Sequence, residues 1–477
     1  MYASACAWNL KSSRRSAGTC RWIILFSVFS GISQAVHALT IDEVMIDAVK
    51  TNPIFKAFRE ATQASHEEVS AALSRWLPNI QLRLQAGAYR SYDERLFDTT
   101  TNMIAGTSSI NLRQNLYRGG RDIASLRQAE ERVRQSGASL RDIEQTILLR
   151  AATVFLDVVR AENTVALREA SLASFQARLR ATEVQFQIGD RTRSDVAQAR
   201  SELNLATAAV AVARADLQAA QASYKNVVGG PPGDLEPASE PSGLPKSLEE
   251  ARRAAKETSP TVRAARHAML AAKHAVEQAA RETEPTLDIV GDLSGTRRWG
   301  DLDHRTADSY LGLEFSVPLY TGGLLDTRLR QARHLFAQMQ EEWHAALRDA
   351  ETRVTTAWYD LHAARERAKA LRSAVDAEQL ALAGIRREAE VGERTTREVL
   401  DSERALVSSQ VNALSAERDV VAYAYALLKS LGQLTLQRLG VTDLPDLERE
   451  AESVRDGELI LLGDLLMDKG KQSGTED

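Results

Sequence analysis

Cysteine is almost absent from this chain, and proline and aromatic residues are scarce. The 477 residues include two cysteines, 11 prolines and 5% aromatic residues, against 26% charged and 44% hydrophobic residues. So few aromatic side chains suit a conventional globular core poorly, and so few prolines leave long stretches uninterrupted. The composition therefore favours long helices over a compact packed globule.

The first 38 residues differ from the rest and are predicted to be a secretory signal peptide. Four basic residues precede or open an apolar stretch over 22–36, and Ala38 is a small residue at which a signal peptidase could cut. The stretch is short for a membrane span, which disfavours a transmembrane anchor. Cys6 and Cys20 both lie here, and neither follows the apolar stretch as the acylated cysteine of a lipoprotein would. The mature chain would therefore have no disulfide.

Charge and motif content exclude several classes of function. Cleavage after Ala38 takes the formal net charge from −5 to −9, because it removes four basic residues and no acidic one, and this argues against nucleic acid as a partner. The sequence has no zinc-protease, phosphate-loop or Gly-x-Ser-x-Gly motif, so neither an enzyme nor a cofactor is predicted. His267 and His274 share a helix face, but two histidines without a third ligand are more typical of a surface than of a metal site.

The mature sequence contains an internal duplication. Asn-Leu-Tyr-Arg-Gly-Gly at 115–120 recurs as Pro-Leu-Tyr-Thr-Gly-Gly at 318–323, and Gly-Asp-Arg-Thr at 189–192 recurs as Gly-Glu-Arg-Thr at 392–395. Both motifs recur at an offset of 203 positions. A constant offset over so long a separation indicates that each half builds the same structure.

Each half is predicted to contain a hairpin of two long β-strands, in which aliphatic and polar residues alternate. The predicted strands are 79–92, 108–117, 286–297 and 308–320, with a polar turn between Asp93 and Gly106. A tilted strand of about 9–11 residues crosses the core of a bilayer, and charged residues opposite aliphatic ones suit a barrel with a wet lumen. The predicted lumen residues are Arg83, Arg113, Asp288 and Glu314.

A soluble sheet packed on one face would show the same alternation in any single strand. Four such strands in an exported protein favour the barrel, but four strands cannot close one, and open sheet edges are not tolerated in lipid. Several copies of the chain would therefore share a barrel. The pattern does not choose between eight strands from two copies and twelve from three.

A helix of unusual length follows each glycine pair, Gly119-Gly120 and Gly322-Gly323, which are the predicted strand–helix junctions. Neither helix contains a proline, and at about 1.5 Å per residue each would span on the order of 100 Å. Gly189 and Gly392 then begin the predicted turns into returning helices. The predicted division is a signal peptide at 1–38, a first repeat at 39–228 with a helical hairpin at 122–228, a Pro/Gly linker at 229–245, a second repeat at 246–439 with a hairpin at 324–432, and an acidic, partly disordered tail at 440–477.

Residues 39 to 440 resemble the TolC-like outer-membrane efflux proteins. The resemblance rests on the two Leu-Tyr-x-Gly-Gly motifs, on Gly-Asp-Arg-Thr with Asp195-Val196, and on Gly-Glu-Arg-Thr with Val399-Leu400-Asp401. Each motif is weak alone, and two ordered copies at one offset make the match specific. The resemblance implies an α+β membrane protein that forms a homotrimer. Four strands per chain would close a twelve-stranded barrel in the outer membrane, among its lipids, and the hairpins would form a tunnel across the periplasm.

The resemblance also implies a passive channel that exports substrates from the periplasm or cytoplasm to the exterior. Its partners would be a periplasmic adaptor and an inner-membrane transporter of the ABC or RND type, in a tripartite efflux pump or a type I secretion system. The alternative is a soluble periplasmic adaptor or scaffold. Such a protein would not need Leu311, Leu313 and Phe315 on one face of a strand and Glu314 on the other. The cargo stays open.

The same resemblance implies a gate at the helical tip. By motif position, Arg394 would bond across to Ser194 and Asp195 of the other hairpin, and Glu398 and Asp401 would ring the narrowest point. Ala389 stands where the family pattern has a tyrosine, so one bond of that gate is missing. Helix capping is the competing interpretation for Asp195 and Glu398, which follow Thr192 and Thr395 by three residues. Asp401 lies a turn further in, which favours the pore role.

Overall fold

The computed structural model describes residues 38–93, 99–300 and 304–441, with backbone alone at 89–93, 99–103 and 300. The predicted signal peptide up to residue 37 and the predicted tail beyond residue 441 lie outside these ranges. Within the described part of the chain, no helix has both the length and the apolarity that a bilayer crossing would require.

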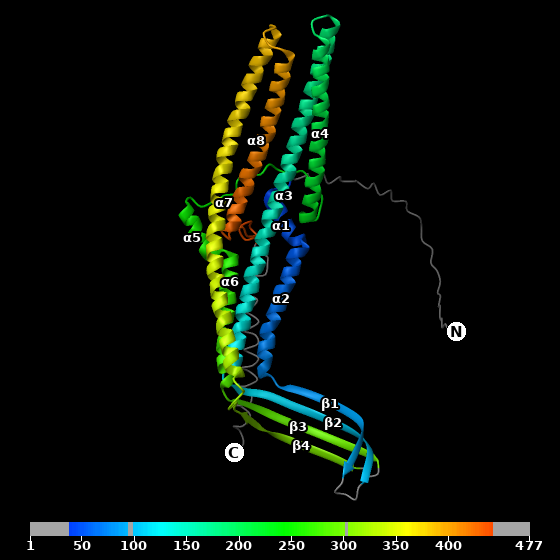
Figure 1. Ribbon diagram of the computed structural model, residues 1–477, viewed down its shortest axis with the longest axis vertical. Helices are drawn as coiled ribbons and strands as arrows, with labels where there is room; N and C mark the ends of the chain where they lie inside the picture. The colour runs from blue at the N-terminus through cyan, green and yellow to red at the C-terminus, as the bar shows by residue number, and fades with distance from the viewer. Residues whose placement is uncertain (1–37, 94–98, 301–303, 442–477) are drawn as a thin grey trace, which may run out of the picture. The chain divides into compact units, whose positions relative to one another are not determined.

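Two repeats of the same elements follow one another along the chain (Figure 1). The first comprises α1 (Ile41–Thr51), α2 (Pro53–Leu73), β1 (Asn79–Asp93), β2 (Thr99–Arg118), α3 (Arg121–Gln187) and α4 (Arg193–Val228). The second comprises α5 (Leu248–Thr258), α6 (Pro260–Ala280), β3 (Thr286–Gly300), β4 (His304–Ser316), α7 (Leu324–Glu390) and α8 (Thr396–Ser430). Equivalent helices match in length, with 11 residues in α1 and α5, 21 in α2 and α6, and 67 in α3 and α7.

Proline and a short polar residue set the start of each connecting helix. Pro53 and Pro260 occupy the first turn of α2 and α6, where a missing backbone N–H costs no helical hydrogen bond. The Asn52 side chain caps α2 by accepting from the backbone N–H of Ile54 at 2.9 Å. Each helix then ends in a 3₁₀ turn that leads directly into a strand. The four extra residues of the first repeat lie in the β1–β2 hairpin, since the offset between repeats changes from 207 at α2 to 203 at α3.

The four strands form one antiparallel sheet in the order β1-β2-β3-β4. Gly106 of β2 marks the register, because it pairs with Ala86 of β1 and with Arg297 of β3. A β-bulge interrupts the pairing of β2 with β3 between Asn115 and Tyr117. Facing residues of paired strands point to the same side of a sheet, so this register fixes which side chains share a face.

Two of the predicted strands have the wrong limits. Strand β2 begins at Thr99 and not at residue 108, so much of the predicted polar turn pairs with β1. The polarity of residues 99–106 led to the prediction of a turn, but threonine is a good strand former although it is polar. Strand β4 occupies His304–Ser316 and not 308–320. It ends before Pro318, which has no N–H to donate to a sheet.

One face of the sheet is aliphatic and exposed in a single copy of the chain. Leu82 of β1 is 66% exposed, Leu293 of β3 is 56% exposed and Leu313 of β4 is 65% exposed. Ile80, Leu84, Ile110, Leu311 and Phe315 extend the same surface. The opposite face carries Arg83, Arg113, Asp288 and Glu314. A soluble sheet would bury its aliphatic face against other elements, and this one does not.

The buried core lies in the helices and is formed by residues of α1, α3, α4, α5, α7 and the C-terminal part of α8. Phe155 and Leu148 of α3 and Leu427 of α8 are fully buried there. The segment after α8 packs against α3, because the Gln145 side chain donates to the Gly432 carbonyl at 2.9 Å and the Leu436 N–H donates to Glu144 at 2.9 Å. Burial raises the pKa of the Glu144 carboxyl above its ordinary value.

Helices α3 and α7 are equivalent in the repeat but are packed differently. Helix α3 is flanked by α2 of its own repeat and by α6 of the next, and α7 packs on α6 of its own repeat. No comparable packing of α2 on α7 occurs among the residues that the structure describes. Twenty residues of α3 are buried, against six of α7.

Candidate functional site

Three of the four predicted lumen residues meet on the charged face of the sheet. Arg113 of β2 donates to Asp288 of β3 at 3.0 Å and to Glu314 of β4 at 2.9 Å, so one guanidinium joins three strands. Asp288 is buried, and Arg118 lies 4.0 Å from its second oxygen. The cluster lines this face with fixed charges of both signs close to the helices.

Arg83 does not join that cluster. It shares the charged face but pairs in register with Ser109, four residues along β2 from Arg113. The predicted lumen set therefore divides into a three-residue cluster near the helices and one arginine further along the sheet.

The strand–helix junctions require glycine for a backbone reason. Gly119, Gly120, Gly322 and Gly323 have φ of 64°, 78°, 65° and 79°, a left-handed conformation that L side chains rarely adopt. The two junctions differ in their surroundings. A Cβ on Gly119 would lie 2.2 Å from the Cβ of Glu284, whereas a Cβ on Gly322 would meet nothing within 4 Å. The turn that follows α6 thus covers the first junction, and the equivalent surface at the second is open in a single copy.

The turns at Gly189 and Gly392 end the long helices remote from the sheet (Figure 1). Both glycines have φ of 85°. The N–H of the next residue, Asp190 or Glu393, donates back to the helix at 2.9 Å, to the carbonyl of Gln185 or Glu388. These bonds satisfy carbonyls that the end of a helix leaves open.

Both returning helices begin with a complete capping box. The backbone N–H of Thr192 donates to Asp195 at 2.9 Å, and that of Thr395 donates to Glu398 at 2.8 Å. In each box the threonine hydroxyl in turn accepts from the backbone N–H of the acid. The bond from the threonine backbone N–H is the main cause that lowers the pKa of each carboxyl, for Asp195 and for Glu398. Capping, the competing interpretation of these two acids, is what their contacts support.

Arg394 does not bond across to the other hairpin in this structure. It donates to Glu388 at 2.8 Å and to Glu398 at 3.0 Å, both in its own hairpin. Ser194 and Asp195, the predicted acceptors, do not accept a hydrogen bond from Arg394 in this structure. The physical reason is local, because Glu388 lies beside Ala389 at the end of α7 and offers a carboxylate within reach.

Asp401 also has cationic neighbours within its own helix. Arg404 donates to it at 2.8 Å, and Arg397 lies at 3.7 Å. Arg404 is in addition 3.6 Å from Glu202 of α4, which links the two hairpins. The acids of the predicted pore ring are therefore partly neutralised within one chain.

A buried ionic contact between the two hairpins involves a residue that was not predicted. Glu403 of α8 is 5% exposed and accepts from Arg178 of α3 and from Arg386 of α7, each at 2.7 Å. Arg178 belongs to the first hairpin and Arg386 to the second. A single buried carboxylate thus holds three helices together about three turns from the tip.

Ion pairs at equivalent positions of the two hairpins have reversed charge. In the first hairpin Arg200 of α4 pairs with Glu183 of α3 at 3.2 Å, whereas in the second Glu403 of α8 pairs with Arg386 of α7. The same reversal occurs further from the tip. The pair of Arg214 with Glu169 at 2.6 Å is equivalent to the pair of Glu417 with Arg372 at 2.6 Å.

A comparison of the repeats could have identified Glu403 from the sequence. At the offset of 203, Glu403 is equivalent to Arg200 and Arg386 is equivalent to Glu183. Both members of one pair thus change sign together, which is a signal for contact. A single charged residue on a helix carries no such signal, because most such residues are solvated.

The chain is similar in sequence to known outer-membrane proteins along most of its length. The model of the outer membrane efflux protein family matches residues 45–230 and 251–433. Outer membrane efflux protein BepC of Brucella suis is 33% identical over 411 residues, which cover 86% of this chain and 88% of that protein. Alkaline protease secretion protein AprF of Pseudomonas aeruginosa is 24% identical over 432 residues, 86% of each chain.

Solved structures share the fold. The outer-membrane channel OprN superposes with a TM-score of 0.71 at 18% identity, over 82% of this chain and 90% of that one. At this identity the likeness shows the fold alone. It is the α+β fold expected from the sequence, with four strands and long helical hairpins.

Proposed function

The chain belongs to the TolC-like outer membrane efflux proteins, and from that premise we propose that it is the passive exit duct of a tripartite efflux pump or of a type I secretion system. It resides in the outer membrane and extends into the periplasm. The alternative of a soluble periplasmic scaffold has no support among its relatives. The proposal gives the chain no catalytic step, and the energy for transport would come from a partner.

The exposed aliphatic face of the sheet is the observation that carries this proposal. Leucine, isoleucine and phenylalanine side chains of all four strands cover one face, and Arg113, Asp288 and Glu314 lie on the other. This is the division between lipid and water that a membrane strand requires. Strands β1 and β4 are the edges of the sheet, and an edge in lipid must be paired.

A homotrimer would pair those edges, with β4 of one copy against β1 of the next. The helices favour the same arrangement, because α6 of the second repeat packs on α3 of the first, and α7 has an equivalent surface that α2 of a neighbouring copy could cover. The surroundings of the junction glycines agree with this. Gly119 is covered by Glu284, whereas the equivalent Gly322 faces open space that a neighbouring copy could fill. Twelve strands and six hairpins would then form one continuous duct.

The gate in this proposal is the set of contacts that holds the hairpins together near the tip. Opening would require the second hairpin to separate from the first, which breaks the bond from Arg178 to Glu403 and the pairing of Arg404 with Glu202. Arg394, Glu398 and Asp401 would act on the second hairpin by stabilising its own turn. Asp195 would do so on the first through its capping bond with Thr192, and Ser194 lies beside it in the same turn.

The partners would be a periplasmic adaptor and an inner-membrane transporter of the ABC or RND type, which meet the tips at Gly189 and Gly392. Small-molecule efflux and protein secretion both remain in the proposal. BepC is named for efflux and AprF for protease secretion. The cluster of Arg113, Asp288 and Glu314 has charges of both signs and favours neither cargo.

Reconstitution of the purified mature chain in planar bilayers tests the proposal. We expect a cation-sensitive conductance that rises when Glu403→Gln and Arg178→Gln weaken the link between hairpins. The matched control is Glu183→Gln, which removes an equivalent pair that does not join the hairpins. A mature chain that is soluble without detergent, or one that gives no conductance in any variant, would contradict the proposal.

A further inference from the structure

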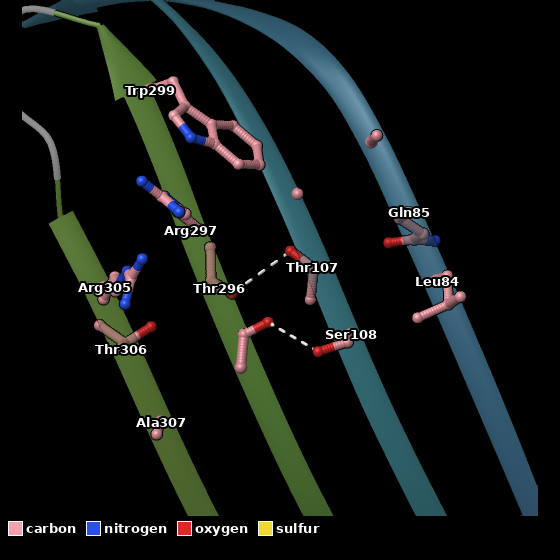
Figure 2. A pocket seen from close by; sticks show the side chains of 13 residues that line it. Leu84, Gln85, Thr107, Ser108, Thr296, Arg297, Trp299, Arg305, Thr306 and Ala307 are labelled. Atoms are coloured by element: carbon pink, nitrogen blue, oxygen red, sulfur yellow. Dashed lines mark hydrogen bonds between the residues drawn. The ribbon is translucent and has the colours of Figure 1, made fainter.

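The two repeats join inside the chain at two levels, in the sheet and in the helices. In the sheet, β2 of the first repeat pairs with β3 of the second, and Figure 2 shows the hydrogen bond of 3.3 Å between the hydroxyls of Thr107 and Thr296 across this junction. In the helices, α6 of the second repeat packs on α3 of the first. Because the repeats are equivalent, α7 of the second repeat can form the same helical junction with α2 of another copy.

One buried polar bond lies in the helical junction between α3 and α6. The Nδ1 atom of His267 on α6 lies 2.7 Å from a carboxylate oxygen of Glu131 on α3. Glu131 is only 7% exposed, and Arg134 of its own helix donates to its other oxygen at 2.5 Å. A buried carboxylate must be paired, so this bond is part of the junction and not of a solvated surface.

The equivalent positions of the other two helices carry the opposite residue types. At the offset of 203, Glu131 of α3 corresponds to His334 of α7. At the offset of 207, His267 of α6 corresponds to Glu60 of α2. Carboxylate and imidazole have thus exchanged places between the repeats. Both positions differ together, as a contact between them requires, since either difference alone would set two acids or two imidazoles against each other.

His334 and Glu60 are unpaired in a single copy of the chain. Both side chains are exposed, and neither forms a hydrogen bond or an ion pair with another residue that the structure describes. Their equivalents in the junction inside the chain are buried or half-buried and bonded to each other. The contrast indicates that α7 and α2 each expose one half of a junction that a second copy completes.

The junction glycines give a second indication of the same contact. Glu284 covers Gly119, and its equivalent at the offset of 207 is Leu77, which is 46% exposed. Gly322, the equivalent of Gly119, has nothing within 4 Å of where its Cβ would project. Leu77 of a neighbouring copy would cover Gly322 as Glu284 covers Gly119. This contact lies next to the sheet, and the histidine and glutamate lie further along the same pair of helices.

We propose that α7 binds α2 of a neighbouring copy through a bond between His334 and Glu60, which repeats the bond between α3 and α6 with its polarity reversed. The inference rests on the exit-duct proposal, because it needs copies that share one barrel. The occupant is α2 and not α6 of another copy, since α6 would set His267 against His334. Bonds of the two polarities would then alternate around the tube at one level.

An exchange of the two residues tests this pair by sedimentation velocity of the purified protein in detergent. His334→Glu should weaken association about tenfold or more, because it sets two acids against each other in the contact. Adding Glu60→His should restore association, since the exchanged pair can bond again, and this rescue excludes a general folding defect. Unchanged association in His334→Glu, or no recovery in the double variant, would overturn the proposal.

Cross-linking with a short bismaleimide tests whether the two positions meet in different copies, since the chain has no cysteine after residue 20. Glu60→Cys/His334→Cys should give cross-linked oligomers on denaturing gels. The matched control is Glu131→Cys/His267→Cys, at the equivalent positions inside the chain, which should cross-link without an increase in mass. Association of the protein without the cross-link between copies would overturn the pair and leave the duct intact, whereas a protein that stays monomeric would overturn both.

Discussion

Helices α3 and α7 are the same length and occupy the same place in the two repeats, yet 20 residues of α3 are buried and only six of α7. The difference follows from what covers them. Helix α3 has neighbours from both repeats, whereas the main neighbours of α7 among the described residues, α5, α6 and α8, all belong to its own repeat. A duplicated chain that contains only two repeats must leave one such surface uncovered, and further copies of the chain can complete it.

The largest effect is expected at a buried position of α3. Leu156 is 4% exposed, and its equivalent in α7 at the offset of 203 is Tyr359, which is 60% exposed. Leu156→Ala should lower the free energy of unfolding by about 2–5 kcal/mol, because it removes buried apolar contacts and leaves a cavity. Chemical denaturation in detergent measures this. Tyr359→Ala should lower the free energy of unfolding of the monomeric chain by less. An equal decrease in the two variants would show that the two helices are packed alike.

A substitution at Tyr359 should act on assembly instead. If a neighbouring copy covers α7, Tyr359→Glu should weaken association by about 2 kcal/mol per contact, as truncated aromatic residues at interface centres often do. Sedimentation velocity in detergent should then show the monomeric chain, and circular dichroism should show an unchanged helix content. Tyr359→Phe is the control and should assemble normally. Full assembly of Tyr359→Glu would mean that this surface of α7 is not an interface.

The two hairpins should also differ in their response to loss of an equivalent acid. Glu403→Gln should cost about 1–2 kcal/mol, because it weakens charge-assisted bonds from Arg178 and Arg386 to a buried oxygen, discounted for the exposure of both arginines. Glu183→Gln removes an exposed pair and should cost about 0–1 kcal/mol. Thermal unfolding monitored by circular dichroism compares them. Equal costs would show that the link between hairpins adds nothing.

The smallest effect is expected from pH at the two tips. The lowered pKa values of Asp195 and Glu398 mean that the capping bonds stabilise the turns above the ordinary pKa values of 3.8 and 4.5. This contribution is lost as the pH falls through the lowered values, so the tips should loosen only under acidic conditions. A spin label on Ser194→Cys, in a chain with no cysteine after residue 20, reports the mobility. Thr192→Ala should lose the dependence on pH, and mobility that rises toward neutral pH would contradict the assignment.

The long elements were predictable because their signals are repeated over many residues. The absence of proline, the glycine breaks and the constant offset predict two helical hairpins, and strict alternation predicts strands. The start of β2 was not predictable in this way. Residues 99–106 are rich in threonine and lack a clear apolar face, and only their pairing with β1 shows that they are strand.

The site was predicted less completely, for a different physical reason. Arg113, Asp288 and Glu314 could be assigned to one face, because alternation fixes the direction of a side chain in a strand. The bonding partner of Arg394 could not be predicted from the sequence. A long flexible side chain can reach several carboxylates, and local geometry decides which of them it binds. Glu403 was missed because burial of a charge between helices depends on packing, which no single helix reveals.

The reversed ion pairs carry a consequence for the route by which the chain folds. Two repeats of one ancestral hairpin would otherwise offer each outgoing helix two nearly equal partners, its own returning helix and that of the other half. With Glu169 and Glu183 on α3 and Glu403 and Glu417 on α8, a hairpin formed from the wrong halves would set acid against acid, and α4 with α7 would set arginine against arginine. Like charges at such positions are repulsive. The duplication thus holds a safeguard against exchange of helices while the chain is being assembled.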